Sequence, residues 1–224
     1  MQPFPAREPE STALPLNSSQ PFLMPAGNQV APGDDSTAEV VLSEFESNSF
    51  GGLLGEGITT VSFFSGDRQA AAVFLKDRLA QVAAANPWMV GHLVKEKRHG
   101  KRCALRFSRE APAVTDAVFQ VKESLSLSED TQYSDLVLNV NNSGAKIPAG
   151  TKLLNTPQPV SKLTVACADG GFALIFSVSH VVCNGGTYYQ LLNMLSADGA
   201  VVAMDPTRQE AMQDKVYEYM GRAH

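Results

Sequence analysis

The sequence predicts an α+β fold, in which hairpin-forming strands and helices are mixed and do not alternate strictly as strand–helix–strand units. Paired strand candidates are the first observation: the segments KLTVACA and FALIFSVSH flank a sharp Asp-Gly-Gly turn at residues 169–171. The second is a long helical segment, DRQAAAVFLKDRLAQVAAAN, in which Leu75, Leu79 and Val82 form one apolar stripe. Together these patterns indicate a sheet covered by at least one helix.

The N-terminal half of the expected fold consists of two strands and this helix. The segments AEVVLSEFES (38–47) and GITTVSFFSG (57–66) have the apolar and β-branched residues that strands favour. Asp67 has the position of an N-cap for the helix, and Asn86-Pro87 ends it, because the residue before proline disfavours helical geometry.

Further strands and helices follow in quick succession. WMVGHLVKEK (88–97) and RCALRFS (102–108) flank a turn-like Arg-His-Gly and predict a hairpin, while AVFQVKES (117–124) and LVLNVNN (136–142) predict two more strands. TYYQLLNML (187–195) has helical spacing of its apolar residues. A last amphipathic helix is expected at 206–220, with Met212, Val216 and Tyr219 on one face.

The chain divides by composition into two parts. Residues 1–38 form a Pro/Ser-rich arm that holds seven of the thirteen prolines, and residues 39–224 form the folded lobe. A segment of this composition buries too little apolar surface to offset its ordering entropy. We therefore expect the arm to become ordered only by docking on its own lobe or on a partner chain.

The bulk composition excludes several functional classes. With 44% hydrophobic residues and a net charge of −5, the chain is typical of a soluble globular protein and not of a nucleic-acid binder. No apolar run approaches the roughly 20 residues of a transmembrane helix, and the N-terminus lacks the pattern of a secretory signal. The three cysteines (Cys103, Cys167 and Cys183) form no disulfide or zinc-site spacing, which predicts an intracellular, reducing compartment, either the cytoplasm or an organelle interior.

His180 is the candidate catalytic residue. It stands in SVSHVVCNGG, at the end of an apolar strand and just before an Asn-Gly-Gly break. Imidazole is the side chain that titrates near neutral pH, and a strand end holds it rigidly beside a loop, as a general base requires. The alternative is a histidine that only ends a strand and bonds locally. The usual phosphate-loop, dinucleotide, serine-hydrolase and zinc-protease motifs are absent from the sequence.

The segment HVVCNG (180–185) resembles the HxxxDG motif of chloramphenicol acetyltransferase-like enzymes, a superfamily that includes plant BAHD acyltransferases and peptide-synthetase condensation domains. The resemblance extends to the strand before the motif and the helix after it. Upstream, LAQVAAANPWMVGHL resembles the first helix and following strand of that family, where an Asn-Pro or His-Pro pattern recurs. In total, the similarity spans roughly residues 38–196.

The resemblance implies a fold and a reaction. The fold would be a two-layer sandwich, a single lobe of the chloramphenicol acetyltransferase-like type. His180 would act as general base and remove a proton from an acceptor hydroxyl, amine or thiol, which then attacks an acyl-CoA thioester. Acyl-CoA would be a co-substrate, with no permanently bound cofactor. Gly185 would let the backbone turn sharply and approach closely, and no acyl-enzyme is needed.

Two departures from the family pattern keep a second reading open. Asn184 replaces the family's aspartate, which is mainly structural and pairs with an arginine. Family members also build the site between two lobes, so this chain would need a homotrimer, a second lobe or a partner chain, with the 206–220 helix as a possible crossover. The DFGWG motif of the second lobe is absent from this sequence. The alternative function is a catalytically inactive structural or assembly subunit of a larger complex.

Several other residues are expected to be structural. Cys183 lies three residues from His180, but a small buried thiol is a better interpretation than a nucleophile. The basic run KEKRHGKR (95–102) is expected to be a solvated hairpin tip, with binding of coenzyme A phosphates as the alternative. His92 and His99 lack acidic or cysteine partners at ligand spacing, so no metal site is expected. Trp88 is expected to be a core or interface aromatic, and Tyr188 is expected to pack in the core.

Overall fold

The computed structural model describes residues 36–49, 52–208, 215 and 218–219, which all belong to one compact unit, Asp34–His224. The predicted arm at 1–38 therefore lies outside the described residues, apart from its last three. Of the helix predicted at 206–220, residues 206–208 are not helical, residues 215, 218 and 219 are helical, and Met212 and Val216 lie outside the described residues. No helix in the described ranges is both long and apolar enough to cross a membrane.

Strands and helices are mixed along the described chain. The strands are β1 (Thr37–Val41), β2 (Ile58–Ser65), β3 (His92–Val94), β4 (Ala104–Ser108), β5 (Phe119–Leu127), β6 (Ser161–Ala168) and β7 (Gly171–Val178). The α-helices are α1 (Glu44–Asn48), α2 (Arg68–Ala85), α3 (Tyr133–Ser143), α4 (Gly150–Leu153) and α5 (Gly185–Met194), and short 3₁₀ helices cover Pro87–Val90 and Lys97–His99.

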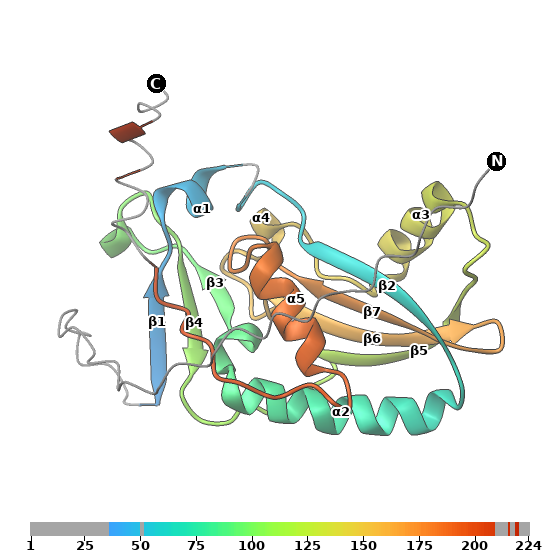
Figure 1. Cartoon of the computed structure of the whole chain (residues 1–224). Helices are drawn as coiled ribbons and strands as arrows, with labels where there is room; N and C mark the ends of the chain where they lie inside the picture. The colour runs from blue at the N-terminus through green and yellow to red at the C-terminus, as the bar shows by residue number, and fades with distance from the viewer. Residues whose placement is uncertain (1–35, 50–51, 209–214, 216–217, 220–224) are drawn as a thin grey trace, which may run out of the picture. The chain divides into compact units, whose positions relative to one another are not determined.

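The strands form two sheets (Figure 1). The larger has the order β2-β7-β6-β5 and is antiparallel except for the parallel pair β5–β6; the smaller has the order β1-β4-β3 and is antiparallel. Two hydrogen bonds join the start of β6 to the segment before β3: Val160 N donates to Gly91 O at 2.9 Å, and Ser161 Oγ donates to Met89 O at 2.7 Å. The architecture is a mixed α/β fold with two sheets.

Helices cover both faces of the larger sheet (Figure 1). Side chains alternate along β7, so Leu174 and Phe176 pack with α2 and α5, whereas Ala173 and Ile175 pack with Val140 of α3. Helix α3 thus adds a partial third layer to the two that the sequence predicted.

The capped helix and the sharpest hairpin are confirmed. The Asp67 side chain accepts a hydrogen bond from Ala70 N at 2.7 Å, and the three stripe residues (Leu75, Leu79 and Val82) are buried. Strands β6 and β7 pair antiparallel around a turn in which Gly170 has φ +72°, a left-handed conformation that favours glycine. The pairing of β3 with β4 confirms the other predicted hairpin, but its first strand is shorter than the predicted 88–97, because 3₁₀ helices precede and follow His92–Val94.

The first predicted strand was too long. Strand β1 ends at Val41, and Ser43 begins helix α1 with a capping box: its Oγ accepts from Glu46 N at 3.1 Å, and Glu46 Oε2 accepts from Ser43 N at 2.8 Å. The Ser-x-x-Glu spacing was visible in the sequence. The capping box begins a helix soon after the two valines of β1, so the strand does not continue through 42–47.

The strand predicted at 136–142 was wrong, because this segment belongs to helix α3. Leu136 and Val140 lie four residues apart and pack together against the larger sheet, a contact that only helical geometry provides. Gly144 ends the helix in the left-handed conformation, with φ +67°. A tertiary contact therefore overrode the β propensity of the valines.

Candidate active site around His180

His180 follows β7 in a tight turn whose backbone is fixed by Ser179. Ser179 is buried, and its N–H donates to Val160 O at 2.7 Å. Ser179 Oγ accepts from Val181 N at 3.4 Å, and its carbonyl accepts from Val182 N at 3.1 Å. We define the His180 loop as residues 179–184, between the end of β7 and the start of α5.

The imidazole of His180 is half-buried and makes no hydrogen bond or ion pair with any residue in the described ranges. Ser179 before it and Val181 after it are buried, so the backbone on both sides of His180 is held by the core. A rigid mount with an unengaged ring is suited to a group that takes a proton from a bound molecule.

A close backbone approach supports the loop from below. A Cβ atom added at Gly150 of α4 would lie 2.8 Å from Val181 Cγ2 and 2.8 Å from Leu53 O, which is too close for any side chain. Gly150 N also donates to Gly55 O at 3.3 Å. Glycine at position 150 therefore lets α4 and the segment before β2 pack directly under the His180 loop.

Asn184 is the N-cap of helix α5. Its Oδ1 accepts a hydrogen bond from Thr187 N at 2.9 Å, while its own backbone is extended. An asparagine at this position satisfies one of the free N–H groups at the start of a helix as well as an aspartate does. The helix that follows the motif is thus held without a carboxylate.

Helix α5 is attached to the larger sheet through Tyr188, which is fully buried. Its hydroxyl donates to Phe176 O at 2.9 Å, accepts from Thr60 N at 3.1 Å and lies 2.7 Å from Thr60 Oγ1. Burial raises the pKa of this hydroxyl to about 12, so Tyr188 stays neutral. The predicted core positions of Tyr188 and Trp88 are confirmed.

Gly185 has no steric requirement among the described residues. It is the first residue of α5, its φ is not in the left-handed region, and an added Cβ would meet no atom within 4 Å. The close approach expected at this glycine is therefore not made by the chain's own described atoms. The space beside it is open.

Cys183 is a buried thiol, as predicted. Its Sγ lies 3.5 Å from Ser179 O, and burial raises its pKa to about 12, with the nearby Arg208 acting in the opposite direction. A thiol with this pKa holds almost no thiolate at neutral pH, so it is a poor nucleophile.

Arg208 and Glu46 are site residues that sequence reasoning missed. Arg208 Nη2 donates to Val182 O at 3.2 Å and contacts Val181 O at 3.5 Å, and its Nε lies 2.8 Å from Glu46 Oε1. The two side chains are 162 positions apart. No local pattern in the sequence signals a pair at that separation.

The basic run at 95–102 is divided between solvent and an ion-pair network. Lys95, Lys97 and Lys101 are exposed, in agreement with a solvated hairpin tip. The guanidinium of Arg98, by contrast, bonds both oxygens of Glu39 at 2.9 and 3.0 Å, and its Nε lies 2.7 Å from Glu96 Oε2.

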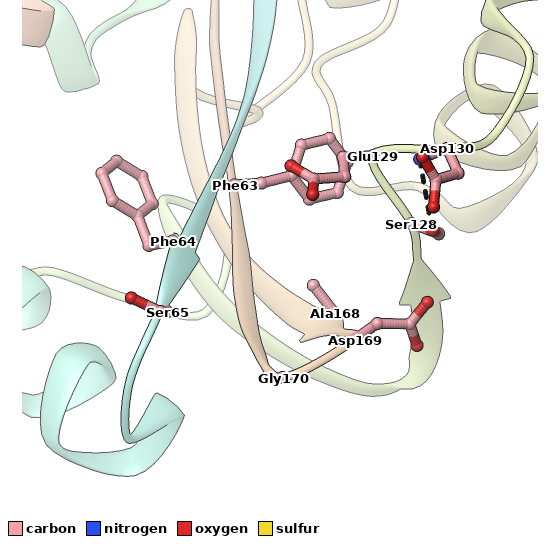
Figure 2. Close-up of a pocket in the computed structure, with 9 residues that line it drawn as sticks. All are labelled: Phe63, Phe64, Ser65, Ser128, Glu129, Asp130, Ala168, Asp169 and Gly170. Carbon is pink, nitrogen blue, oxygen red and sulfur yellow. Dashed lines mark hydrogen bonds between the residues drawn. The ribbon is translucent and has the colours of Figure 1, made fainter.

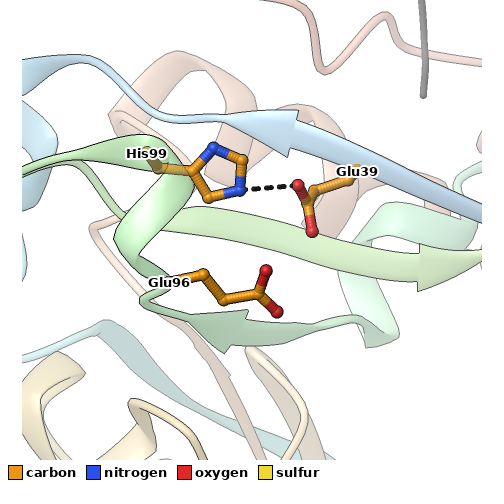
Figure 3. Close-up of side chains that lie close together, drawn as sticks. All are labelled: Glu39, Glu96 and His99. Atoms are coloured by element: carbon orange, nitrogen blue, oxygen red, sulfur yellow. Dashed lines mark ion pairs between the residues drawn. The ribbon is translucent and has the colours of Figure 1, made fainter.

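His99 belongs to the same network, so the expectation that it has no acidic partner was wrong (Figure 3). Its Nε2 lies 2.7 Å from Glu39 Oε1, and these two groups and Glu96 bring their oxygen and nitrogen atoms within 4.8 Å of one another. Two carboxylates and an imidazole are a possible donor set for a divalent cation. Arg106 and Arg98 already bond these carboxylates, however, with Arg106 Nη2 at 2.7 Å from Glu39 and 2.5 Å from Glu96.

A cavity beside the larger sheet (Figure 2) lies at the opposite end of β7 from His180. It has a volume of about 240 Å³, and its lining comprises Phe63, Phe64, Ser65, Ser128, Glu129, Asp130, Ala168, Asp169 and Gly170. Strand β7 has eight residues, so the cavity is about 26 Å from the strand end that precedes His180. This cavity is therefore not the space in which His180 could act.

No protein-family model and no curated protein matches the chain. It is similar to the solved structure of TRI101 from F. sporotrichioides complexed with coenzyme A and T-2, with 16% identity, a TM-score of 0.48, and coverage of 75% of this chain and 40% of that chain. A structure on condensation domain-mediated chain release from the enacyloxin polyketide synthase shows 15% identity, a TM-score of 0.42, and coverage of 75% and 31%. The X-domain from teicoplanin biosynthesis shows 14%, 0.45, and coverage of 75% and 36%. The chain spans 40% or less of the length of these three proteins.

Proposed function

We propose that this chain is a single lobe of a chloramphenicol acetyltransferase-like acyltransferase, in which His180 is the general base. The observation that carries the proposal is the imidazole itself: it is half-buried, rigidly mounted between buried Ser179 and Val181, and engaged by no described residue. The HVVCNG motif (180–185), with the strand before it and the capped helix after it, supports the same assignment.

The proposed reaction transfers an acyl group from acyl-CoA to a hydroxyl or amine. A ring nitrogen of His180 removes the proton of the acceptor as the acceptor's oxygen or nitrogen attacks the thioester carbonyl carbon. The carbon–sulfur bond then breaks, and the protonated imidazole returns the proton to the departing coenzyme A sulfur. Ester or amide and free coenzyme A result, with His180 restored. Cys183 takes no part, because its thiol is buried and protonated.

A second candidate is a non-catalytic binding or assembly subunit with the same fold. Asn184 supports it, because its helix-capping role needs no catalytic function. Large apolar side chains also lie exposed on elements that hold or flank the His180 loop: Phe45 is 58% exposed, Leu54 46% and Tyr189 56%. A surface of this kind fits a partner chain as well as a second lobe.

The test combines solution mass with thioester turnover. Light scattering on the purified chain gives its oligomeric state, and a mass near three times 24.0 kDa means that neighbouring lobes can complete the site. Release of coenzyme A from acetyl-CoA is then followed with a thiol reagent, in the presence of a panel of alcohols and amines. His180→Gln is the informative variant, because it keeps a polar side chain of similar size and removes the base. Turnover that survives His180→Gln in full would exclude the enzymatic function and favour the binding subunit.

A further inference from the structure

We propose that Arg208, paired with Glu46, is a positioning residue that fixes the His180 loop in its working conformation. As a statement about catalysis, this inference rests on the proposed function. As a statement about the loop, it stands on contacts alone. Arg208 lies in the described segment 201–208, which contains no helix or strand and which we call the C-terminal strap.

The Arg208 guanidinium makes contacts in three directions at once. Nη2 donates to the carbonyls of Val182 and Val181 at 3.2 and 3.5 Å, and Nη1 donates to Pro206 O at 2.8 Å. Nε lies 2.8 and 3.0 Å from the two oxygens of Glu46. The planar, five-donor geometry of arginine permits this division, and the single ammonium group of lysine does not reproduce it.

The two loop carbonyls need such a donor. Val181 and Val182 are buried, follow the end of β7 and precede the start of α5, so neither the sheet ladder nor the helix bonds their carbonyl oxygens. Among the described residues, Arg208 is the donor to both. A buried carbonyl without a partner is costly, so the loop conformation depends on this guanidinium.

Contacts other than the pair with Arg208 hold Glu46 in place. Its Oε2 accepts from Ser43 N in the capping box of α1, and the Oγ of the next residue of that helix, Ser47, accepts at 2.9 Å from the N–H of Cys103, the residue before β4 of the smaller sheet. The side chains of Arg208 and Glu46 are only 18% and 23% exposed, which shields the pair from solvent. The Arg208–Glu46 ion pair therefore connects the His180 loop to helix α1 and, through α1, to the smaller sheet.

The C-terminal strap is held at a second point, by hydrogen bonds to the side chain of Asn86. This amide is fully buried; its Nδ2 donates to Val202 O at 2.9 Å, and its Oδ1 accepts from Met204 N at 2.8 Å. Asn86 thus bonds the strap as a neighbouring strand would, four residues before Arg208. The two anchors fix the path of the strap from α2 to the His180 loop.

Cys183 provides a readout that needs no enzymatic activity. It lies within the loop, is 6% exposed and has its thiol against Ser179 O, so it can be alkylated only when the loop opens. Cys103, fully buried immediately before β4, reports unfolding of the rest of the chain. Iodoacetamide labelling, read by mass spectrometry of the peptides, measures both rates in one sample of the full chain.

The test compares Arg208→Gln and Glu46→Gln with the matched control Arg98→Gln, which breaks an ion pair far from the loop. Glutamine at 46 retains the capping box, so only the charge pairing is lost. We expect Arg208→Gln to label Cys183 about tenfold or more faster than the wild type, the scale of one lost charge-assisted hydrogen bond. Removal of the Arg208 charge also raises the pKa of the Cys183 thiol and slows alkylation, so any acceleration reports loop opening.

Each outcome decides the proposal. Acceleration at Cys183 with an unchanged Cys103 rate, in both variants and not in Arg98→Gln, supports it. An unchanged Cys183 rate overturns it, as does equal acceleration at Cys103 and Cys183 in both variants, which would assign the pair to general stability.

Where thioester turnover is measurable, a positioning role also predicts a lower kcat with little change in KM for acyl-CoA, and partial rescue by Arg208→Lys. In a wild type without turnover, the labelling result alone decides the role of Arg208.

Discussion

Two histidines that follow strands of this protein have contrasting surroundings. His99, after β3, lies in a network with Glu39, Glu96 and two arginines, and its side chain is 11% exposed. His180, after β7, is half-buried and meets no partner in the described chain. An imidazole held beside a carboxylate and guanidinium groups has a structural environment, whereas one mounted rigidly without a partner is available to a bound molecule.

Substitution of each histidine in turn is the strongest test of the contrast between His180 and His99. His180→Ala should lower thioester turnover by about 10²–10⁴-fold, the usual contribution of a positioned base, and change the free energy of unfolding by about 0.5 kcal/mol or less. His99→Gln should leave turnover unchanged. Coenzyme A release measures the turnover of each variant, and urea denaturation measures its free energy of unfolding. A loss of turnover in His99→Gln equal to that in His180→Ala would remove the distinction between the two sites.

The cap of the motif helix sharpens the meaning of Asn184. Asn184→Ala should lower the free energy of unfolding by about 0.5–2 kcal/mol, because Thr187 N loses its acceptor. Asn184→Asp should be equal to the wild type or more stable by up to about 1 kcal/mol, since a carboxylate at a helix N-terminus interacts favourably with the helix dipole. Chemical denaturation compares the two. A marked loss of stability in Asn184→Asp would show that a carboxylate is not tolerated beside the His180 loop.

The stability that the ion-pair network contributes should depend on pH and salt. The His180 loop takes no part in this network, so its conformation should not change with it. The hydrogen bond from Arg106 is the main cause that lowers the pKa of Glu96 in the folded state. Its stabilisation is thus present above the unfolded-state pKa and is lost as the pH falls through the lower, folded-state pKa. Arg106→Gln should lower the free energy of unfolding by about 1 kcal/mol or less, and by less still at high salt. Denaturation curves across an acid series, with and without 1 M salt, check this; an acid response that Arg106→Gln does not reduce would contradict it.

The smallest expected effect is at Gly185. Since an added Cβ meets nothing and the backbone is ordinary, Gly185→Ala should raise the free energy of unfolding slightly, by about 0.5 kcal/mol or less. If a substrate or a second lobe approaches this glycine closely, turnover or assembly falls in the same variant. Thermal denaturation, thioester turnover and light scattering on Gly185→Ala separate these effects. Lost stability in the isolated chain would mean that the space beside Gly185 is not open.

Local patterns in the sequence determined much of this protein. The apolar stripe and cap of α2, the two hairpins and the mounting of His180 between a strand and a helix depend on residues a few positions apart. Such spacings act within one element, so they are readable before the chain folds. Even the start of α1 was encoded locally, in the spacing of Ser43 and Glu46.

Tertiary structure alone decided the partners of the side chains. Folding joined Arg208 to Glu46 across 162 positions, Tyr188 to Thr60 across 128, and brought His99 against Glu39. It also made a helix of 136–142, because packing of Leu136 and Val140 against the larger sheet outweighed the strand propensity of the valines. Hydrogen bonds and ion pairs between distant residues depend on the path of the whole chain, which no local period encodes.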